Sequence, residues 1–200
     1  MRIALPILLL ALACQKPRPQ ADCTYEYDPS STTVTWTAYK FTEKAGVTGS
    51  FDRIATEGLK TGATPAAVFE SLAFKVETAS VNTKNPDRDS KIHRSFFQKL
   101  KEGETLQGSV KEIKAEQAQV DLRINGVARQ AHFKVQTTDS KDSVQVSFSS
   151  DLDLQDYGAD AAIASLNTAC KELHTGSDGK SKLWPDVKID ITTRLKKKCL

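Results

Sequence analysis

The chain has 200 residues and a formal net charge of +3, with 28 Lys and Arg against 25 Asp and Glu. A charge so close to balance lacks the basic excess expected of a nucleic-acid-binding surface. The length suits one domain with a sizeable hydrophobic core.

The first residues have the pattern of an export signal. An apolar run at positions 3–13 follows Met1 and Arg2 and ends immediately before Cys14. One positive charge, a short apolar run and a small residue are typical of a secretory signal peptide. The run is shorter than the roughly 20 residues of a membrane-spanning helix. We therefore expect residues 1–13 to be removed on export.

The residues around Cys14 resemble the lipobox of bacterial lipoproteins, although Ala11 and Leu12 stand in the reverse of the usual order. The resemblance implies that Cys14 becomes the lipidated N-terminus and anchors the protein to a bacterial membrane, facing the periplasm or the cell surface. Ordinary secretion, with Cys14 as a plain thiol, is the alternative. The polar, proline-containing stretch that follows predicts a tether over residues 14–31, and the folded domain is expected to span residues 32–200.

From residue 32 onward, apolar and polar residues alternate in about eight segments. A period of two predicts strands that each have one apolar and one polar face. Asn125-Gly126 is typical of a tight hairpin turn between two of them. The candidate inward-facing residues are Val34, Trp36, Phe51, Leu72, Phe74, Val76, Val120, Leu122, Ile124, Phe133, Val135, Val146, Phe148 and Ile189.

Half-apolar antiparallel strands bury their apolar faces either in a sandwich or in a closed barrel. Short connections between successive strands favour an all-β, eight-stranded antiparallel up-and-down barrel. A barrel of this size is wide enough either to be filled by its own side chains or to hold one small ligand. The pattern alone does not distinguish a filled barrel from an open one.

Two segments interrupt the alternation, and each predicts a short helix. The first lies within residues 86–100 and begins with a dense charged cluster at residues 87–91. Capping of the helix by Asp87 explains this cluster, and an active site is the alternative. The second spans residues 159–174, where one apolar stripe of the helix comprises Ile163, Leu166, Cys170 and Leu173.

If Cys14 is lipidated, three cysteines remain, and two of them can pair. Cys170 lies on the apolar stripe and is expected to be a buried free thiol. Cys23 and Cys199 flank the first and last strands, which are antiparallel neighbours in an up-and-down barrel. We therefore expect a Cys23–Cys199 disulfide in the oxidising space outside the cytoplasm.

The chain lacks the common hydrolase, nucleotide-binding and zinc-site motifs. His93, His132 and His174 are far apart in the sequence and are interpreted as structural or surface residues. A metal site that joins His174 to Asp178 is the alternative to a glycine-rich turn at that point. Trp184 is interpreted as a plug at the end of the barrel, with an aromatic gate as the alternative. We expect no catalytic residue, metal or cofactor.

Three blocks of sequence together resemble one bacterial family. They are residues 34–51, with Gly-Val-Thr-Gly-Ser-Phe after a Trp-containing strand, residues 80–89, Ser-Val-Asn-Thr-Lys-Asn-Pro-Asp-Arg-Asp, and residues 165–187, which end in Leu-Trp-Pro-Asp-Val. In their order and spacing they resemble the YceI-like proteins, a periplasmic family related in shape to the lipocalins. The resemblance covers about residues 32–195.

This resemblance implies a lipocalin-like barrel whose lumen binds a long apolar lipid, namely a polyisoprenoid, an isoprenoid quinone or a fatty-acid amide. The inward-facing residues named above are then the candidate lipid-binding residues, and the lipid is held without chemical change. A ligand-free envelope module with a filled core is the alternative function. An enzyme is the least favoured reading.

Overall fold

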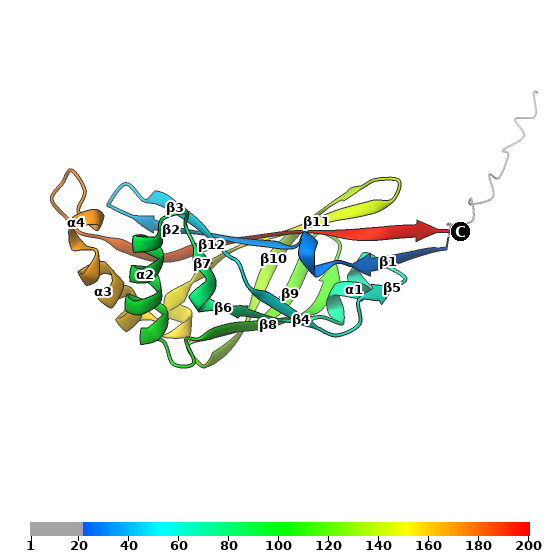
Figure 1. Ribbon diagram of the computed structural model, residues 1–200, viewed down its shortest axis with the longest axis horizontal. Coiled ribbons are helices and arrows are strands. Elements are labelled where there is room, and N and C mark those ends of the chain that lie inside the picture. The colour runs from blue at the N-terminus through cyan, green and yellow to red at the C-terminus, as the bar shows by residue number, and fades with distance from the viewer. Residues whose placement is uncertain (1–21) are drawn as a thin grey trace, which may run out of the picture.

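The computed structural model describes residues 22–200, which form a curled antiparallel sheet with short helices at its ends (Figure 1). The predicted signal peptide, Cys14 and the start of the predicted tether lie outside the described residues. The strands are β1 (Cys23–Tyr27), β2 (Thr33–Lys40), β3 (Ala45–Phe51), β4 (Ile54–Glu57), β5 (Thr61–Gly62), β6 (Ala73–Glu77), β7 (Val81–Asn82), β8 (Thr105–Lys114), β9 (Gln117–Ile124), β10 (Val127–Asp139), β11 (Ser143–Asp153) and β12 (Leu183–Cys199).

The eight predicted strands correspond to the longer strands β2, β3, β6 and β8–β12, so the mostly β, antiparallel class is confirmed. The sheet has twelve strands, ten of which follow the order β4-β6-β8-β9-β10-β11-β12-β2-β3-β7, while β1 and β5 branch from β12. This path is open, because β4 and β7 at its two ends are not paired with each other in the part of the chain that the structure describes. The molecule is therefore a half-barrel rather than the closed eight-stranded barrel that was expected.

The predicted tether extends too far along the chain. Strand β1 lies inside residues 14–31 and pairs with both β12 and β5. A short 3-10 helix, η1 (Pro29–Ser31), then joins β1 to β2. The folded domain therefore begins before residue 32, because the end of β12 offers hydrogen-bonding groups that β1 satisfies.

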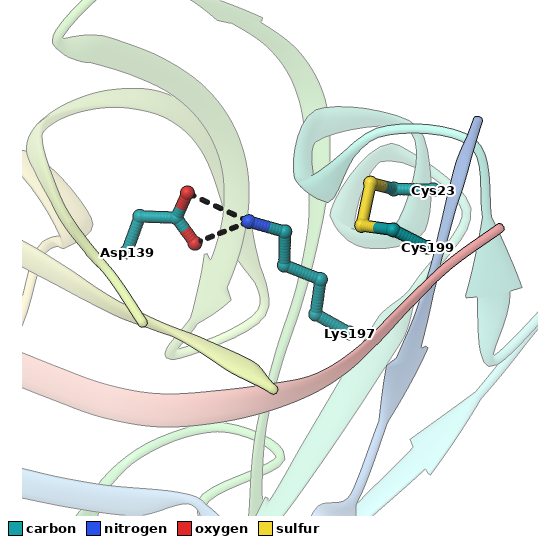
Figure 2. The surroundings of a disulfide bond; sticks show 4 residues. All are labelled: Cys23, Asp139, Lys197 and Cys199. Carbon is teal, nitrogen blue, oxygen red and sulfur yellow. Dashed lines mark hydrogen bonds and ion pairs between the residues drawn. A yellow bond between two sulfur atoms is a disulfide. The ribbon is translucent and has the colours of Figure 1, made fainter. Parts of the chain in front are cut away.

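The strand-pairing argument for the disulfide is confirmed. Cys23 and Cys199 are directly opposite each other in the β1–β12 register and are bonded. Cys170 is a buried free thiol, as predicted. Figure 2 shows that Lys197 extends beside the disulfide to Asp139 at the end of β10, with its Nζ 2.7 and 2.8 Å from the two carboxylate oxygens.

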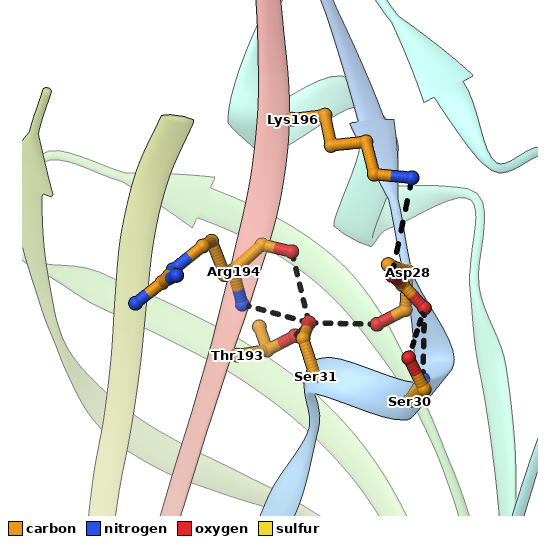
Figure 3. Close-up of polar contacts among 6 residues, drawn as sticks. All are labelled: Asp28, Ser30, Ser31, Thr193, Arg194 and Lys196. Carbon is orange, nitrogen blue, oxygen red and sulfur yellow. Dashed lines mark hydrogen bonds and ion pairs between the residues drawn. The ribbon is translucent and has the colours of Figure 1, made fainter. Parts of the chain in front are cut away.

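The corner between β1 and β2 is fixed to β12 by side-chain hydrogen bonds (Figure 3). The hydroxyl of Ser31 donates to the carbonyl of Asp28 at 2.7 Å and accepts from the backbone N–H of Arg194 at 3.1 Å. Hydrogen bonds from the side chain and backbone of Ser30 hold the pKa of Asp28 below its usual range. These bonds satisfy the polar groups of the corner, where the ladder is interrupted.

Three helices gather at the end of the long axis opposite the disulfide and the C-terminus: α2 (Pro86–Ser95), α3 (Asp160–Ala169) and α4 (Lys171–His174) (Figure 1). They confirm the two predicted helical segments. A further helix, α1 (Pro65–Glu70), lies at the other end and was not predicted. Among the described residues, no helix has both the length and the apolar character to cross a membrane.

Short 3-10 helices complete the chain between these elements: η2 (Thr78–Ser80), η3 (Phe97–Lys99) and η4 (Leu154–Tyr157). Phe97 of η3 is buried and makes an edge-to-face contact with Phe51, their ring centroids 5.9 Å apart. This contact joins the segment after α2 to the apolar face of β3. The core thus continues from the sheet into the helical end of the molecule.

Candidate functional site

A cavity of about 600 Å³ lies at the helical end of the half-barrel. Its walls come from the concave face of the sheet and from α2 and α3. The sheet contributes apolar side chains from β2, β3 and β12, including Trp36, Phe51 and Ile189. The volume lies within the roughly 300–1,000 Å³ of typical small-molecule sites.

Each of the two longer helices turns one face toward this cavity. On α2 and just beyond it, Arg88, Ile92 and Phe96 recur every four residues and all line the space. The predicted apolar stripe of the second helical segment, Ile163, Leu166, Cys170 and Leu173, lines it as well. Periodicity thus identified the inward face of α3 correctly, whereas Leu173 on α4 is 56% exposed at the edge of the cavity.

A second cavity of about 140 Å³, called the inner cavity below, lies next to the first and extends along the concave face of the sheet toward α1. Five residues line both cavities and form the boundary between them: Phe51, Leu106, Ile124, Leu152 and Ile189. The inner cavity is otherwise lined by side chains from most strands of the sheet, with two each from β4, β6, β8, β9 and β12, and by Phe69 of α1. The two spaces form an apolar interior that side chains do not fill.

Most of the candidate lipid-binding residues line one cavity or both. They are Val34, Trp36, Phe51, Leu72, Phe74, Val76, Val120, Leu122, Ile124, Phe133, Phe148 and Ile189. Val135 and Val146 are exceptions, because they line neither space. Both are buried in the hydrophobic core, at 4% and 1% exposure. Their alternation identified an inward face, but period two does not indicate where along a strand the interior is filled.

Sequence reasoning missed the contribution of α2 to the site. The charged cluster at residues 87–91 was attributed to helix capping, with an active site as the alternative, and no binding surface for a lipid was expected there. In the structure, Asp87, Arg88 and Lys91 line the larger cavity. The helix cap is Asn85, whose side-chain oxygen accepts a hydrogen bond from the backbone N–H of Arg88 at 3.0 Å, so the predicted cap at Asp87 is wrong. The four-residue spacing of Arg88, Ile92 and Phe96 was the available signal for an inward face.

Trp184 lies at the helical end and lines the larger cavity. It follows Leu183, at a bulge where the β12–β2 register shifts before Val187. Its indole N–H donates to the carbonyl of Phe41 at 2.7 Å, and the ammonium of Lys182 lies 3.3 Å from its ring centroid. Both contacts fix a half-buried ring at the edge of the cavity, a position that fits the plug and the aromatic gate equally well.

His174 is buried at the end of α4 and also lines the larger cavity. Its Nδ1 lies 3.0 Å from the Oδ1 atom of Asn167. Burial, and secondarily the nearby charge of Lys40, lower the pKa of His174 below its usual value of 6.5, so the ring is neutral at pH 7. Asp178 instead accepts hydrogen bonds from Thr42 and from the backbone of Lys180.

The other two histidines are peripheral to the chemistry of the cavity. His132 is exposed on β10, as alternation with Phe133 predicted, and His93 is half-buried on α2. Within residues 22–200, no group of three or more His, Cys, Asp or Glu side chains is arranged to hold a metal ion. The features of the site are therefore its apolar volume and its charged edge.

A protein-family model described as a YceI-like domain matches residues 25–195. A comparison with curated proteins found no match. Among solved structures, the chain is similar to a polyisoprenoid binding domain from Saccharophagus degradans, with a TM-score of 0.61, 14% identity and coverage of 88% of this chain and 99% of that one.

Two further structures have a similar fold. BcnA from Burkholderia cenocepacia gives a TM-score of 0.57 at 12% identity and covers 84% of this chain and 99% of its own. The YCEI protein of Campylobacter jejuni gives 0.55 at 19% identity, with 77% and 86% covered. At these identities the similarity establishes the fold alone, a curled antiparallel half-barrel.

Proposed function

Because this chain belongs to the YceI-like domain family, we propose that it binds the apolar chain of one long lipid inside the half-barrel. The observation that carries the proposal is the apolar interior formed by the two adjoining cavities. The solved structure from Saccharophagus degradans is described as a polyisoprenoid binding domain, which supports a polyisoprenoid as the chain. Isoprenoid quinones and fatty-acid amides offer the same apolar character.

The energetics favour a long chain over a short one. Each buried methylene contributes about 0.8 kcal/mol. Ten buried methylenes therefore contribute roughly 8 kcal/mol. The entropic cost of association is roughly 4–15 kcal/mol, so a chain of this length offsets that cost only if it is near the low end of the range. A ligand that occupies the larger cavity alone gains less than one that continues past Phe51 and Ile189 into the inner cavity. We therefore infer that the ligand spans both.

The lining residues favour holding the lipid without chemical change. Apolar side chains make up most of the lining of both cavities. The buried histidine in the lining, His174, is hydrogen-bonded to Asn167. We propose a carrier or sequestering role at the bacterial envelope. In this proposal Cys14, which lies outside the described residues, provides the membrane anchor, and the protein faces the periplasm or the cell surface.

Native mass spectrometry followed by organic extraction tests the proposal. The wild-type protein is expected to retain, or to take up from added polyprenol, one lipid per chain. Leu166→Trp adds bulk inside the larger cavity and should reduce uptake about tenfold or more, because the ring occupies space that the chain needs. Ala164→Trp is the matched control, since Ala164 is exposed on the same helix and does not line the cavity.

Failure of the wild type to bind any long-chain lipid would overturn the proposal and favour a ligand-free envelope module. Equal loss of binding in both tryptophan variants would show that the effect comes from the helix rather than from the cavity. Circular dichroism of each variant separates loss of binding from loss of folding.

A further inference from the structure

The rim of the larger cavity differs in charge from its interior. Three cationic residues line the cavity, Lys40, Arg88 and Lys91, against one acidic residue, Asp87. The neighbouring His174 adds no charge at pH 7, because burial lowers its pKa. Asp87 and Arg88 are exposed and Lys91 is half-buried, so this part of the lining is where the cavity reaches the surface.

The cations at this rim have no counter-ion within ion-pairing distance among residues 22–200. Within the described part of the chain, Lys40, Arg88 and Lys91 make no ion pair within 4.0 Å, although nearby Lys44 is paired with Asp186 at 3.0 Å. The ammonium of Lys40 instead donates to the carbonyl of Leu173 at 2.9 Å. This hydrogen bond orients Lys40 at the rim and leaves its positive charge unneutralised.

The face of α2 that lines the cavity is charged near the N-terminus of the helix and apolar toward its C-terminus. Arg88 is one turn from Lys91 and Ile92, and Phe96 follows one turn further on, all lining the cavity. The helix has ten residues, and its cap Asn85 also lines the cavity, so the partial positive charge of the helix N-terminus adds to that of the side chains. An amphipathic ligand on this face meets positive charge at the surface and apolar groups below.

We propose that the bound lipid carries an acidic headgroup, a carboxylate or a phosphate, which Arg88 and Lys91 hold at the α2 rim while the chain lies in the cavities. This inference rests on the proposed function and specifies its ligand. The guanidinium of Arg88 is suited to paired hydrogen bonds with two oxygens of such a group, and Lys91 supplies a second charge. A neutral headgroup would leave the charges at this rim without a counter-ion.

Matched lipids that differ only in headgroup charge test the inference. Affinity is measured at pH 8 and low salt by quenching of intrinsic tryptophan fluorescence, because Trp36 and Trp184 both line the larger cavity. Oleate is compared with methyl oleate, and a polyprenyl phosphate with the corresponding polyprenol. The wild type should bind the acidic member of at least one pair about tenfold to a hundredfold more tightly. The pair that shows the preference identifies the carboxylate or the phosphate as the headgroup.

Variants of α2 then locate the headgroup. Arg88→Glu combined with Lys91→Glu should remove the preference, so that the acidic lipid loses more affinity than its neutral partner and no longer binds more tightly. Arg94→Glu makes the same type of charge change on the same helix, at an exposed position that does not line the cavity, and should keep the preference. Arg88→Gln combined with Lys91→Gln provides a milder variant should the double reversal fail to fold.

Each remaining outcome is decisive. If the wild type binds both members of each pair with equal affinity, the acidic headgroup is overturned. The same holds if the α2 variants lose equal affinity for the acidic and the neutral lipids. Either result leaves the lipid-binding proposal intact. Absence of binding to all four lipids overturns the proposed function itself and this inference with it.

Discussion

Trp36 on β2 lies against the backbone of Gly49, its direct cross-strand partner on β3. A Cβ atom at position 49 would lie 2.7 Å from Cε2 of the indole and 2.9 Å from Cγ2 of Thr83, closer than side-chain atoms approach. The same arrangement recurs between Phe74 and its partner Gly108, where an added Cβ would clash with Cζ of the phenyl ring and lie 2.8 Å from its Cε2 atom. Two cavity-lining aromatics therefore depend on the absence of a side chain opposite them.

Replacing Gly49 by Ala should displace the indole of Trp36 and destabilise the fold by about 1–3 kcal/mol, the usual cost of overpacking. Urea unfolding followed by tryptophan fluorescence measures this change. Gly46→Ala is the control on the same strand, because Gly46 is exposed and the nearest neighbour of an added Cβ is the end of the Thr37 side chain, at 3.1 Å. A stability change in Gly49→Ala no larger than in this control would contradict the close packing.

Removing the disulfide with Cys23→Ser and Cys199→Ser should lower the free energy of unfolding by about 2–5 kcal/mol. The bond closes a loop with a sequence separation of 176 residues, so its loss greatly expands the unfolded ensemble. Reduced wild-type protein should unfold at the same denaturant concentration as the double variant. If the oxidised and reduced wild-type proteins unfold together, the bond does not contribute to stability.

Acidification should destabilise the protein through His174. Its pKa is lowered in the folded state by burial and by Lys40, so the unfolded chain takes up a proton near pH 6.5 while the folded chain resists it. The contribution of neutral His174 to stability is therefore lost as the pH falls from about 6.5 through the lower folded-state pKa. His174→Gln should flatten the dependence of unfolding free energy on pH over this window. His132→Gln, at an exposed position, should leave it as in the wild type.

The proposed anchor predicts a change of location on substitution of Cys14. Cys14→Ser should release the protein from bacterial membranes into the soluble fraction, because two or three acyl chains hold a protein durably whereas an unmodified N-terminus does not. Fractionation and immunoblotting of the parent and the variant provide the measurement. A variant that sediments with membranes to the same extent as the parent would show that the lipoprotein proposal is wrong.

Sequence alternation predicted the long strands because one face of each is buried and the other is exposed. Trp36, Val120 and Phe148 are inward members of such strands, and each lines a cavity. Strands β5 and β7 have only two residues each, too few for a period of two to be visible. Alternation also does not show whether the first and last strands of the sheet pair with each other, because an open and a closed sheet bury the same face of every strand.

The candidate site was predictable where it is apolar and hidden where it is charged. The stripe from Ile163 to Leu173 was visible because apolar residues recur at helical spacing. On α2, Arg88 and Lys91 have the composition of a solvated surface, and only packing against α3 and the sheet brings them to a cavity. The cap of α2 was predicted at the wrong residue because Asn85 and Asp87 are both good capping residues and lie two positions apart. The sequence alone did not decide between them, and the structure places the cap at Asn85.

The position of the disulfide also determines how the protein bears force. Chain entering from the N-terminal side reaches the sheet at Cys23, the first residue of β1, where it is covalently bonded to the end of β12. Tension on that side passes through sulfur into the seventeen-residue β12, which extends to the helical end of the molecule. The β1–β12 hydrogen bonds are thereby protected from being peeled apart one by one. A pull on this side is therefore borne by β12, the longest strand, rather than by the five-residue β1 alone.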